Sequence, residues 1–201
     1  MRKFLVFICA LTMVFGMVVS ANAATMITDL QDIWAIGGIT IDLPGSDSDT
    51  FTSISDPFGG QIGFSPAVQH RTVGSTWATW STTYGDPAGL EILYSSASFL
   101  AVDFAPGGVY AFGFELEPNP FDVFTFYLGL SDGSIQTQDV SGSAGALTFG
   151  FTEGDVSWMA VHGGSDFAIG RLTMLKSVPE PATMFLLGFG LLGLGLARRK
   201  S

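Results

Sequence analysis

The sequence predicts an all-β protein built as a β-sandwich, most simply a jelly roll, and two observations lead to this prediction. Apolar and small or polar residues alternate along several short segments; in residues 110–116, for example, large apolar side chains occupy every second position. Such a period of two is typical of a half-buried strand. Turn residues separate these segments, and no stretch of the middle keeps a helical period, which together favour a sandwich of ten or so strands.

The elements can be expected in chain order from the same pattern. Residues 26–34 favour either a short helix or a first strand. The strands expected after them cover residues 36–43, 51–55, 68–73, 77–82, 89–94, 99–104, 110–116, 123–130, 135–140, 146–151, 156–162 and 167–175. Asp132 and Gly133 carry the sequence signal of a β-hairpin turn, so residues 123–130 and 135–140 are expected to pair.

Composition excludes several classes of function. The chain has 201 residues, a net charge of −10 and only 8 Lys and Arg, most of them near its two ends. A nucleic-acid-binding protein needs a basic face, so this class is excluded. Cys9 is the single cysteine, which excludes an intrachain disulfide and any site built on several cysteines.

The N-terminal residues 1–23 have the three parts of a secretory signal peptide. Arg2 and Lys3 are followed by an apolar run over residues 4–19, and Ala21 and Ala23 then supply the small residues of a cleavage site. We expect export by the Sec machinery and cleavage after Ala23. The alternative is an uncleaved membrane anchor.

The C-terminal residues 178–201 contain a second apolar segment. Residues 178–181 include two prolines and disfavour a helix, and the uncharged residues 182–197 precede a short basic end. As a helix this run spans about 24 Å, slightly less than the ~30 Å core of a bilayer. The sequence predicts a single transmembrane helix whose basic end stays cytoplasmic.

The order of these C-terminal features carries a resemblance. Pro179, Glu180 and Pro181, a Gly- and Leu-rich helix, and Arg198 and Arg199 resemble the PEP-CTERM sorting signal. The resemblance implies recognition by exosortase, removal of the tail at or near the motif, and export by a Gram-negative bacterium that makes extracellular polysaccharide. The alternative is an ordinary tail anchor preceded by prolines.

The middle of the chain, residues 24–177, carries a second resemblance. Residues 105–114, 131–134, 149–151 and 167–169 resemble the exported domain of many PEP-CTERM proteins, which is itself similar to concanavalin-like jelly rolls. That domain usually ends in Ile-Asp-Asn, whereas this chain has Ile169 followed by Gly170 and Arg171. The resemblance implies the fold more than the function.

The predicted exported domain is strongly acidic. Residues 24–177 contain 17 acidic and 3 basic residues, a net charge of −14. Such a surface keeps a protein soluble and repels anionic polymers unless divalent cations bridge the two. Asp47 and Asp49 are separated by one residue in an acidic loop, and hard oxygen ligands on a turn suit Ca²⁺, so the two are candidate calcium ligands. A plain acidic loop is the alternative.

Catalytic patterns are weak, and we expect no enzymatic activity. Glu115 and Glu117 share one face of a strand, as the carboxylates of some glycosidases do, but their place beside Pro118 favours a solvated strand end. No nucleophile elbow occurs around any serine. A triad of a serine with His162 and Asp166 is not favoured over a packing role for these residues.

An aromatic group in residues 77–84 is a candidate carbohydrate site. Trp77, Trp80 and Tyr84 lie close in the sequence, and aromatic rings stack on the flat faces of sugars. On one strand, residues three apart face opposite sides, so one of the two tryptophans is expected to be exposed. Packing in the core is the alternative.

These observations favour an exported, exosortase-sorted protein of the cell surface or extracellular matrix. It would pass through a transient inner-membrane anchor and associate with extracellular polysaccharide or biofilm without catalysing a reaction. A lectin-like carbohydrate-binding module is the alternative, and a secreted polysaccharide hydrolase is the third.

Overall fold

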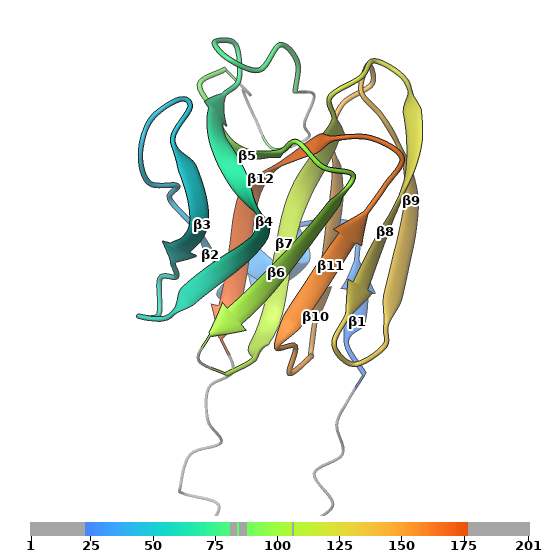
Figure 1. Ribbon diagram of the computed structural model, residues 1–201. Coiled ribbons are helices and arrows are strands. Elements are labelled where there is room, and N and C mark those ends of the chain that lie inside the picture. Colours follow the sequence, from blue (N-terminus) through green and yellow to red (C-terminus); the bar gives the residue numbers. More distant parts are fainter. Residues whose placement is uncertain (1–22, 81–83, 85–87, 106, 177–201) are drawn as a thin grey trace, which may run out of the picture.

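The computed structural model describes residues 23–80, 84, 88–105 and 107–176, and in these ranges the protein is all-β apart from one short helix (Figure 1). The elements in chain order are β1 (Thr25–Ile27), α2 (Gln31–Ala35), β2 (Ile39–Thr40), β3 (Thr50–Ser55), β4 (Gln61–Thr72), β5 (Glu91–Ser95), β6 (Phe99–Ala105), β7 (Val109–Pro118), β8 (Val123–Leu130), β9 (Ile135–Ser141), β10 (Leu147–Thr152), β11 (Trp158–His162) and β12 (Phe167–Lys176). Apart from Ala23, the predicted signal peptide lies outside these residues, as does the predicted C-terminal helix. Within them, no helix combines the length and the apolar character that crossing a membrane requires.

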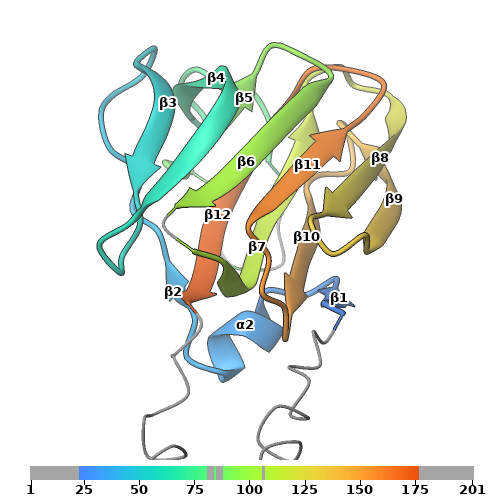
Figure 2. The same ribbon diagram turned by 60° about the horizontal axis from the view of Figure 1, so that its bottom comes forward.

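The strands form one antiparallel sheet that folds over into two layers. The first layer has the order β1-β10-β7-β12-β5, and the second has β6-β11-β8-β9. Strand β4 joins the layers, because its residues 61–65 pair with β6 while its residues 69–72 pair with β5. The start of β1 and the end of β12 lie at the same end of the sandwich (Figures 1 and 2), which we call the anchor pole.

Side chains of β9 bring the two free edges of the sheet together. Gln136 donates a hydrogen bond from Nε2 to the carbonyl of Ile27 (2.8 Å) and accepts one at Oε1 from the backbone N–H of Gly150 (3.1 Å). Gln138 donates to the carbonyl of Thr148 (2.6 Å). The sandwich is therefore nearly closed into a barrel, with side chains bridging the gap between β9 and the β1–β10 edge.

Phenylalanines fill the space between the layers. Phe112 and Phe114 point inward from β7, and their partners from other strands include Phe126, Phe149, Phe151 and Phe167, all fully buried. The rings of Phe114 and Phe149 stack, and those of Phe126 and Phe167 meet edge to face. Burial of each such side chain stabilises the fold by about 1.5–3 kcal/mol, so the predicted alternation of residues 110–116 and 123–130 is confirmed by the packing, except that Tyr110 packs outside this core.

The outer faces of the two layers differ. Helix α2 and residues 73–80 cover the outer face of the first layer: Leu30 and Ile33 are fully buried there, and Trp77 and Trp80 are nearly so. A Cβ atom on Gly113 would lie 2.8 Å from both Leu30 and Ile33, so α2 rests directly on the backbone of β7. No described segment covers the outer face of the second layer in this way.

Several predicted elements require correction. Residues 36–43 form only the two-residue strand β2, because α2 ends at Ala35 and Gly37 (φ +92°) reverses the chain. Residues 77–80 are not a strand: the carbonyl of Thr72 accepts hydrogen bonds from the backbone N–H groups of Thr76 and Trp77, which closes a turn. Residues 26–34 contain both predicted alternatives, since β1 is followed by α2.

Strand β4 begins earlier than the sequence indicates, whereas the β8–β9 hairpin forms where it was predicted. Gly63 and Pro66 interrupt the apolar pattern of residues 61–67, so that half of β4 was missed. In the hairpin, Leu130 donates a backbone hydrogen bond to Ser134 (3.0 Å), and Gly133 has a φ of +90°. An Asp-Gly turn suits this geometry, because glycine adopts a positive φ without a steric cost.

We predict that Gly150→Ala destabilises the sandwich, because β10 and β7 approach too closely at this position for a side chain. The new Cβ would lie 2.6 Å from the carbonyl oxygen of Phe112 and 2.7 Å from the Cα of Gly113, both backbone atoms. The expected loss in the free energy of unfolding is about 1–3 kcal/mol, measured by denaturant unfolding. Gly129→Ala is the matched control, since nothing lies within 4 Å of its Cβ; equal stability of the two variants would contradict the packing described.

Candidate functional site

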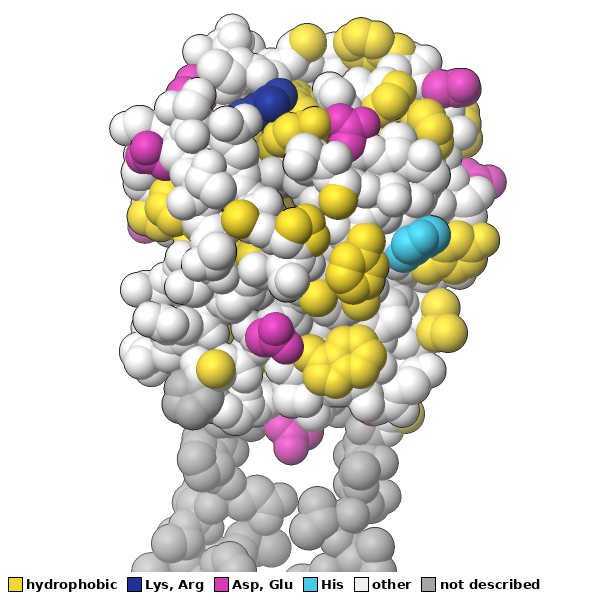
Figure 3. All heavy atoms as spheres, viewed as in Figure 1, with side chains coloured by type: hydrophobic (Ala, Val, Ile, Leu, Met, Phe, Trp, Pro, Cys, Tyr) yellow, Lys and Arg dark blue, Asp and Glu magenta, His cyan; other side chains and the backbone are white. Residues whose placement is uncertain are grey.

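The outer face of the second layer carries exposed aromatic side chains from three neighbouring strands. Phe99 of β6, Tyr127 of β8 and Trp158 of β11 are 42%, 47% and 45% exposed. His162 lies directly between Phe99 and Tyr127 in the strand register, and its ring is 6.5 Å from that of Tyr127. Figure 3 shows hydrophobic side chains gathered over these strands, and we call this surface the aromatic face.

A strip of small residues lies between the aromatic residues. Ala101, Ala160 and Gly129 are aligned across β6, β11 and β8, and the space above Gly129 is open, since a Cβ there would have no neighbour within 4 Å. Trp158 lies four residues along β11 from His162, or about 13 Å at the rise of a strand. The arrangement is an accessible surface with a tryptophan on one side and a row of rings on the other.

Sequence reasoning did not find the aromatic face, although a usable signal was present. The alternation that puts Phe126 and Leu128 in the core necessarily turns Tyr127 outward, and Met159 and Val161 do the same for Trp158. What the alternation does not indicate is whether another segment covers the outward side chains. The sequence therefore points to Trp77, Trp80 and Tyr84, which lie close together along the chain, and not to this face.

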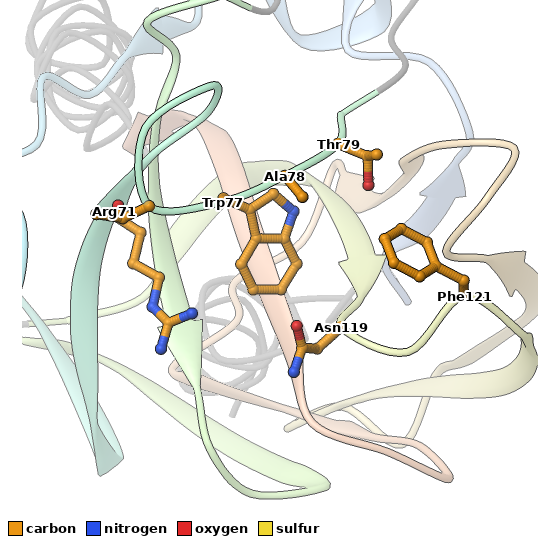
Figure 4. Close-up of a pocket in the computed structure, with 7 residues that line it drawn as sticks. Arg71, Trp77, Ala78, Thr79, Asn119 and Phe121 are labelled. Carbon is orange, nitrogen blue, oxygen red and sulfur yellow. The ribbon is translucent and has the colours of Figure 1, made fainter.

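A small pocket lies at the end of the sandwich opposite the anchor pole. Its volume is about 210 Å³, and it is lined by Arg71, Thr76, Trp77, Ala78, Thr79, Asn119 and Phe121. Figure 4 shows the ring of Trp77 between Arg71 and Phe121. The guanidinium of Arg71 lies 3.9 Å from the ring centroid of Tyr94 and 5.8 Å from that of Trp77, so this cation is held against aromatic rings, and no carboxylate among the described residues forms an ion pair with it.

Trp77, Trp80 and Tyr84 do not form an exposed aromatic surface. Trp77 and Trp80 are only 5% and 3% exposed, so the expectation that one of them is exposed is wrong. The reason is that they lie in a covering loop, not on a strand, and both turn toward the first layer. Tyr84 lies beside α2, where its hydroxyl donates to Asp29 (2.8 Å) and accepts from the backbone N–H of Leu30 (2.9 Å).

Glu115 and Glu117 share the outer face of β7, as predicted, but the expected solvated strand end is wrong, since both are only 1% exposed. Residues 73–80 cover this part of the first layer. Glu115 accepts hydrogen bonds at Oε2 from Nε1 of Trp80 (2.9 Å) and from Nε of Arg171 (3.1 Å), the second also being an ion pair. Glu117 accepts one at Oε1 from the hydroxyl of Thr79 (2.6 Å).

Burial raises the pKa of Glu117 from its ordinary value of 4.5 to about 7, and the hydrogen bond from Thr79 opposes this shift. Oε2 of Glu117 and the nearby buried Nε1 of Trp77 have no hydrogen-bond partner among the described residues. Two carboxyl groups with different environments can serve as acid and base. Here both are closed off from solvent, so the geometry gives no support to hydrolysis at this pair.

The two candidate calcium ligands of the acidic loop, Asp47 and Asp49, accept hydrogen bonds from different donors. Asp47 accepts hydrogen bonds from the hydroxyls of Thr72 and Ser75, and the bond from Thr72 lowers its pKa. Asp49 accepts from the backbone N–H of Ser46. Within the described residues no group of three or more His, Cys, Asp or Glu side chains is arranged to hold a metal ion, and calcium binding at Asp47 and Asp49 stays a prediction.

The remaining candidates lie apart or outside the described residues. Asp166 accepts hydrogen bonds from Tyr94 and Asn119, and in the described part of the chain it forms no ion pair with His162. The structure thus gives no support to a catalytic triad. Of the signal cleavage residues, Ala23 is the first described residue and is exposed, and Ala21 lies outside the described residues. The sorting residues Pro179, Glu180, Pro181, Arg198 and Arg199 also lie outside them.

We predict that Arg171→Met lowers the free energy of unfolding by about 3 kcal/mol, because it leaves the carboxylate of Glu115 buried without its cation. Lys176→Met is the matched control: it also removes an ion pair to a buried carboxylate, but Asp56 keeps hydrogen bonds from the N–H groups of Phe58 and Gly60. Adding Glu115→Gln to Arg171→Met should restore part of the loss. Equal effects of the two single variants in chemical denaturation would argue against this role for Arg171.

We predict that Glu117 makes the protein less stable as the pH rises from about 4.5 to 7. In this window the unfolded chain releases the proton of Glu117 while the folded protein retains it, so ionisation favours unfolding. The penalty is on the order of 3 kcal/mol above pH 7. Glu117→Gln should remove it, which melting temperatures of both proteins between pH 4 and pH 8 would reveal. Parallel pH profiles of the two proteins would show that Glu117 is not responsible.

Comparison with known proteins identifies the C-terminal segment. Residues 177–200 match the family model described as the PEP-CTERM protein-sorting motif, and no curated protein matches the chain. A solved structure that matches is the family 11 carbohydrate-binding module of cellulosomal cellulase Lic26A-Cel5E of Clostridium thermocellum, with 8% identity over 81% of this chain and 99% of that chain, and a TM-score of 0.19. That score is too low to support a conclusion. The chain thus carries a PEP-CTERM protein-sorting motif, as Pro179, Glu180, Pro181 and the arginines after them predicted.

Proposed function

We propose that this protein is an exported, exosortase-sorted component of the cell surface or extracellular matrix that associates with extracellular polysaccharide and catalyses no reaction. The sorting motif at residues 177–200 carries the proposal. It implies export and a membrane-anchored precursor in a Gram-negative bacterium. Export by Sec, processing by exosortase and a final place in a biofilm are the steps that the proposal adds.

The geometry of the domain supports this route. The motif begins at residue 177, directly after β12 ends at Lys176. A membrane anchor in that segment attaches to the sandwich at the anchor pole. The small pocket, which is lined by Arg71 near the end of β4 and by Asn119 just after β7, then lies at the far end. The aromatic face runs along one side (Figure 3). Both surfaces remain accessible to extracellular material while the precursor is still anchored.

The burial of Glu115 and Glu117 favours a binding role for the domain over a catalytic one. Its carboxylate pair on β7 is closed off beneath residues 73–80, and an enzyme acting on a polymer needs its acid and base to reach the substrate. The two antiparallel layers joined by β4 support the finer proposal of a jelly-roll or concanavalin-like sandwich.

A lectin-like carbohydrate-binding module is the second candidate. The exposed aromatic residues of the second layer favour it, because aromatic rings stack on the apolar faces of sugars. The two proposals are compatible, since a matrix protein that holds polysaccharide needs a binding surface. They differ in whether the domain itself makes a specific contact with sugar.

We predict that changing Pro179, Glu180 and Pro181 together to alanine traps the anchored precursor. The motif would no longer be recognised, so the protein should stay in the inner membrane at the mass of the tail-bearing form. Fractionation and intact-mass measurement in a host that encodes exosortase would test this. Ser177→Ala is the matched control and should be processed normally. Release of the triple variant at the same mass as the unchanged protein would refute the sorting proposal.

A further inference from the structure

We propose that the aromatic face binds an uncharged polysaccharide chain by stacking sugar rings against Phe99, Tyr127 and Trp158. This inference deepens the proposed function, on which it rests, by naming the surface and the class of polymer. The chain would lie on the strip of small residues formed by Ala101, Ala160 and Gly129. The exposure, the spacing and the charge of this face support the proposal.

The outer faces of the two layers differ in how much of their side chains is buried. The first layer hides its outer side chains beneath α2 and residues 73–80, whereas the second layer leaves three aromatic rings each more than 40% exposed. Ile135, which lies opposite Gly129 in the strand register, is 68% exposed as well. Contiguous apolar surface of this kind typically marks a site of contact with another molecule. Scattered surface residues would not align in register across three strands.

The spacing of the side chains on the aromatic face suits a sugar ring. Phe99, His162 and Tyr127 form a row across β6, β11 and β8, and Trp158 lies about 13 Å away along β11. Between them the sheet carries only small side chains, and the space above Gly129 is open. A pyranose ring whose hydroxyl groups are equatorial presents flat C–H faces, which fit against such a surface while its rim of hydroxyls meets the polar groups at the edge. Asp103, paired with Trp158, and Thr137, paired with Tyr127, stand at that edge.

The charge of the domain favours a neutral partner over an acidic one. No Lys or Arg of the described chain lies on the aromatic face: Arg171 pairs with Glu115, Lys176 pairs with Asp56, and Arg71 packs on Tyr94. The domain as a whole has a charge of −14 over residues 24–177, from 17 acidic and 3 basic residues. It repels a second copy of itself, an anionic membrane surface and an acidic polymer. A neutral polysaccharide is not repelled.

The test is affinity electrophoresis of the purified full chain in mild detergent, in gels that contain hydroxyethylcellulose as a neutral glucan or polygalacturonate as an acidic one. We expect the neutral polymer to retard the protein and the acidic polymer to have no effect. Trp158→Ala and Tyr127→Ala should each weaken binding by about tenfold. Trp158→Phe should retain most of the affinity, because it keeps a ring to stack.

Two further variants separate binding at this face from general effects. Phe121→Ala is the matched control, since Phe121 is 64% exposed but belongs to the small pocket, and it should bind as the unchanged protein does. Gly129→Leu places a bulky side chain in the open space over the strip, where a Cβ has no neighbour within 4 Å. It should abolish retardation while the melting temperature stays close to that of the unchanged protein.

Three outcomes would overturn the inference. They are the absence of retardation by the neutral glucan, retardation that persists in Trp158→Ala and Tyr127→Ala, and self-association in sedimentation that Trp158→Ala abolishes, which would identify a second copy as the partner. The assay uses unprocessed protein and therefore does not depend on sorting. If it fails while the triple alanine variant is still trapped in the membrane, only the binding inference falls.

Discussion

The buried carboxylate of Glu115 fixes how the first layer of the sandwich is covered. It lies on the outer face of β7, a central strand, and a charge in that position must be paired and hydrogen-bonded to be tolerated. Arg171 supplies the cation from an irregular stretch of β12, where its backbone has a positive φ of +50° and the pairing with β7 changes register. Trp80 supplies a second donor from the covering loop. The interaction thus joins two strands and the covering loop on the outer face of the first layer.

Local alternation was enough to predict most strands, because the core is formed by side chains that alternate along each strand. It failed where the reason for the structure lies elsewhere in the chain. Gly63 and Pro66 interrupt the alternation in β4, whose two halves pair with different layers. Trp77 and Trp80 are residue types common in strands, but here they lie in a loop that covers the first layer. Glu117 looked solvated from its neighbours Pro118 and Asn119, since nothing in the local sequence shows that residues 73–80 lie over it.

The same limit explains why the sequence indicates an exposed aromatic surface at Trp77, Trp80 and Tyr84, where the structure shows none. Residue type alone does not distinguish Trp77 and Trp80, which are buried, from Trp158, which is exposed. The difference is tertiary: the covering loop and α2 both pack on the first layer, and the second layer is left without a cover. Period two correctly turns Tyr127 outward, but only the pairing of β6, β11 and β8 shows that Phe99, His162 and Tyr127 form one row.

The domain combines a strongly negative net charge with an exposed apolar face, on which Asp103 is paired with Trp158 and no Lys or Arg of the described residues lies. An exposed apolar face on an uncharged protein would favour self-association, whereas the net charge of −14 opposes the approach of a second copy from any direction. That repulsion acts on charged partners alone, so a neutral polymer reaches the aromatic face without opposition. Under the proposed binding mode, the net charge therefore opposes self-association through the aromatic face while a neutral polysaccharide can still contact it.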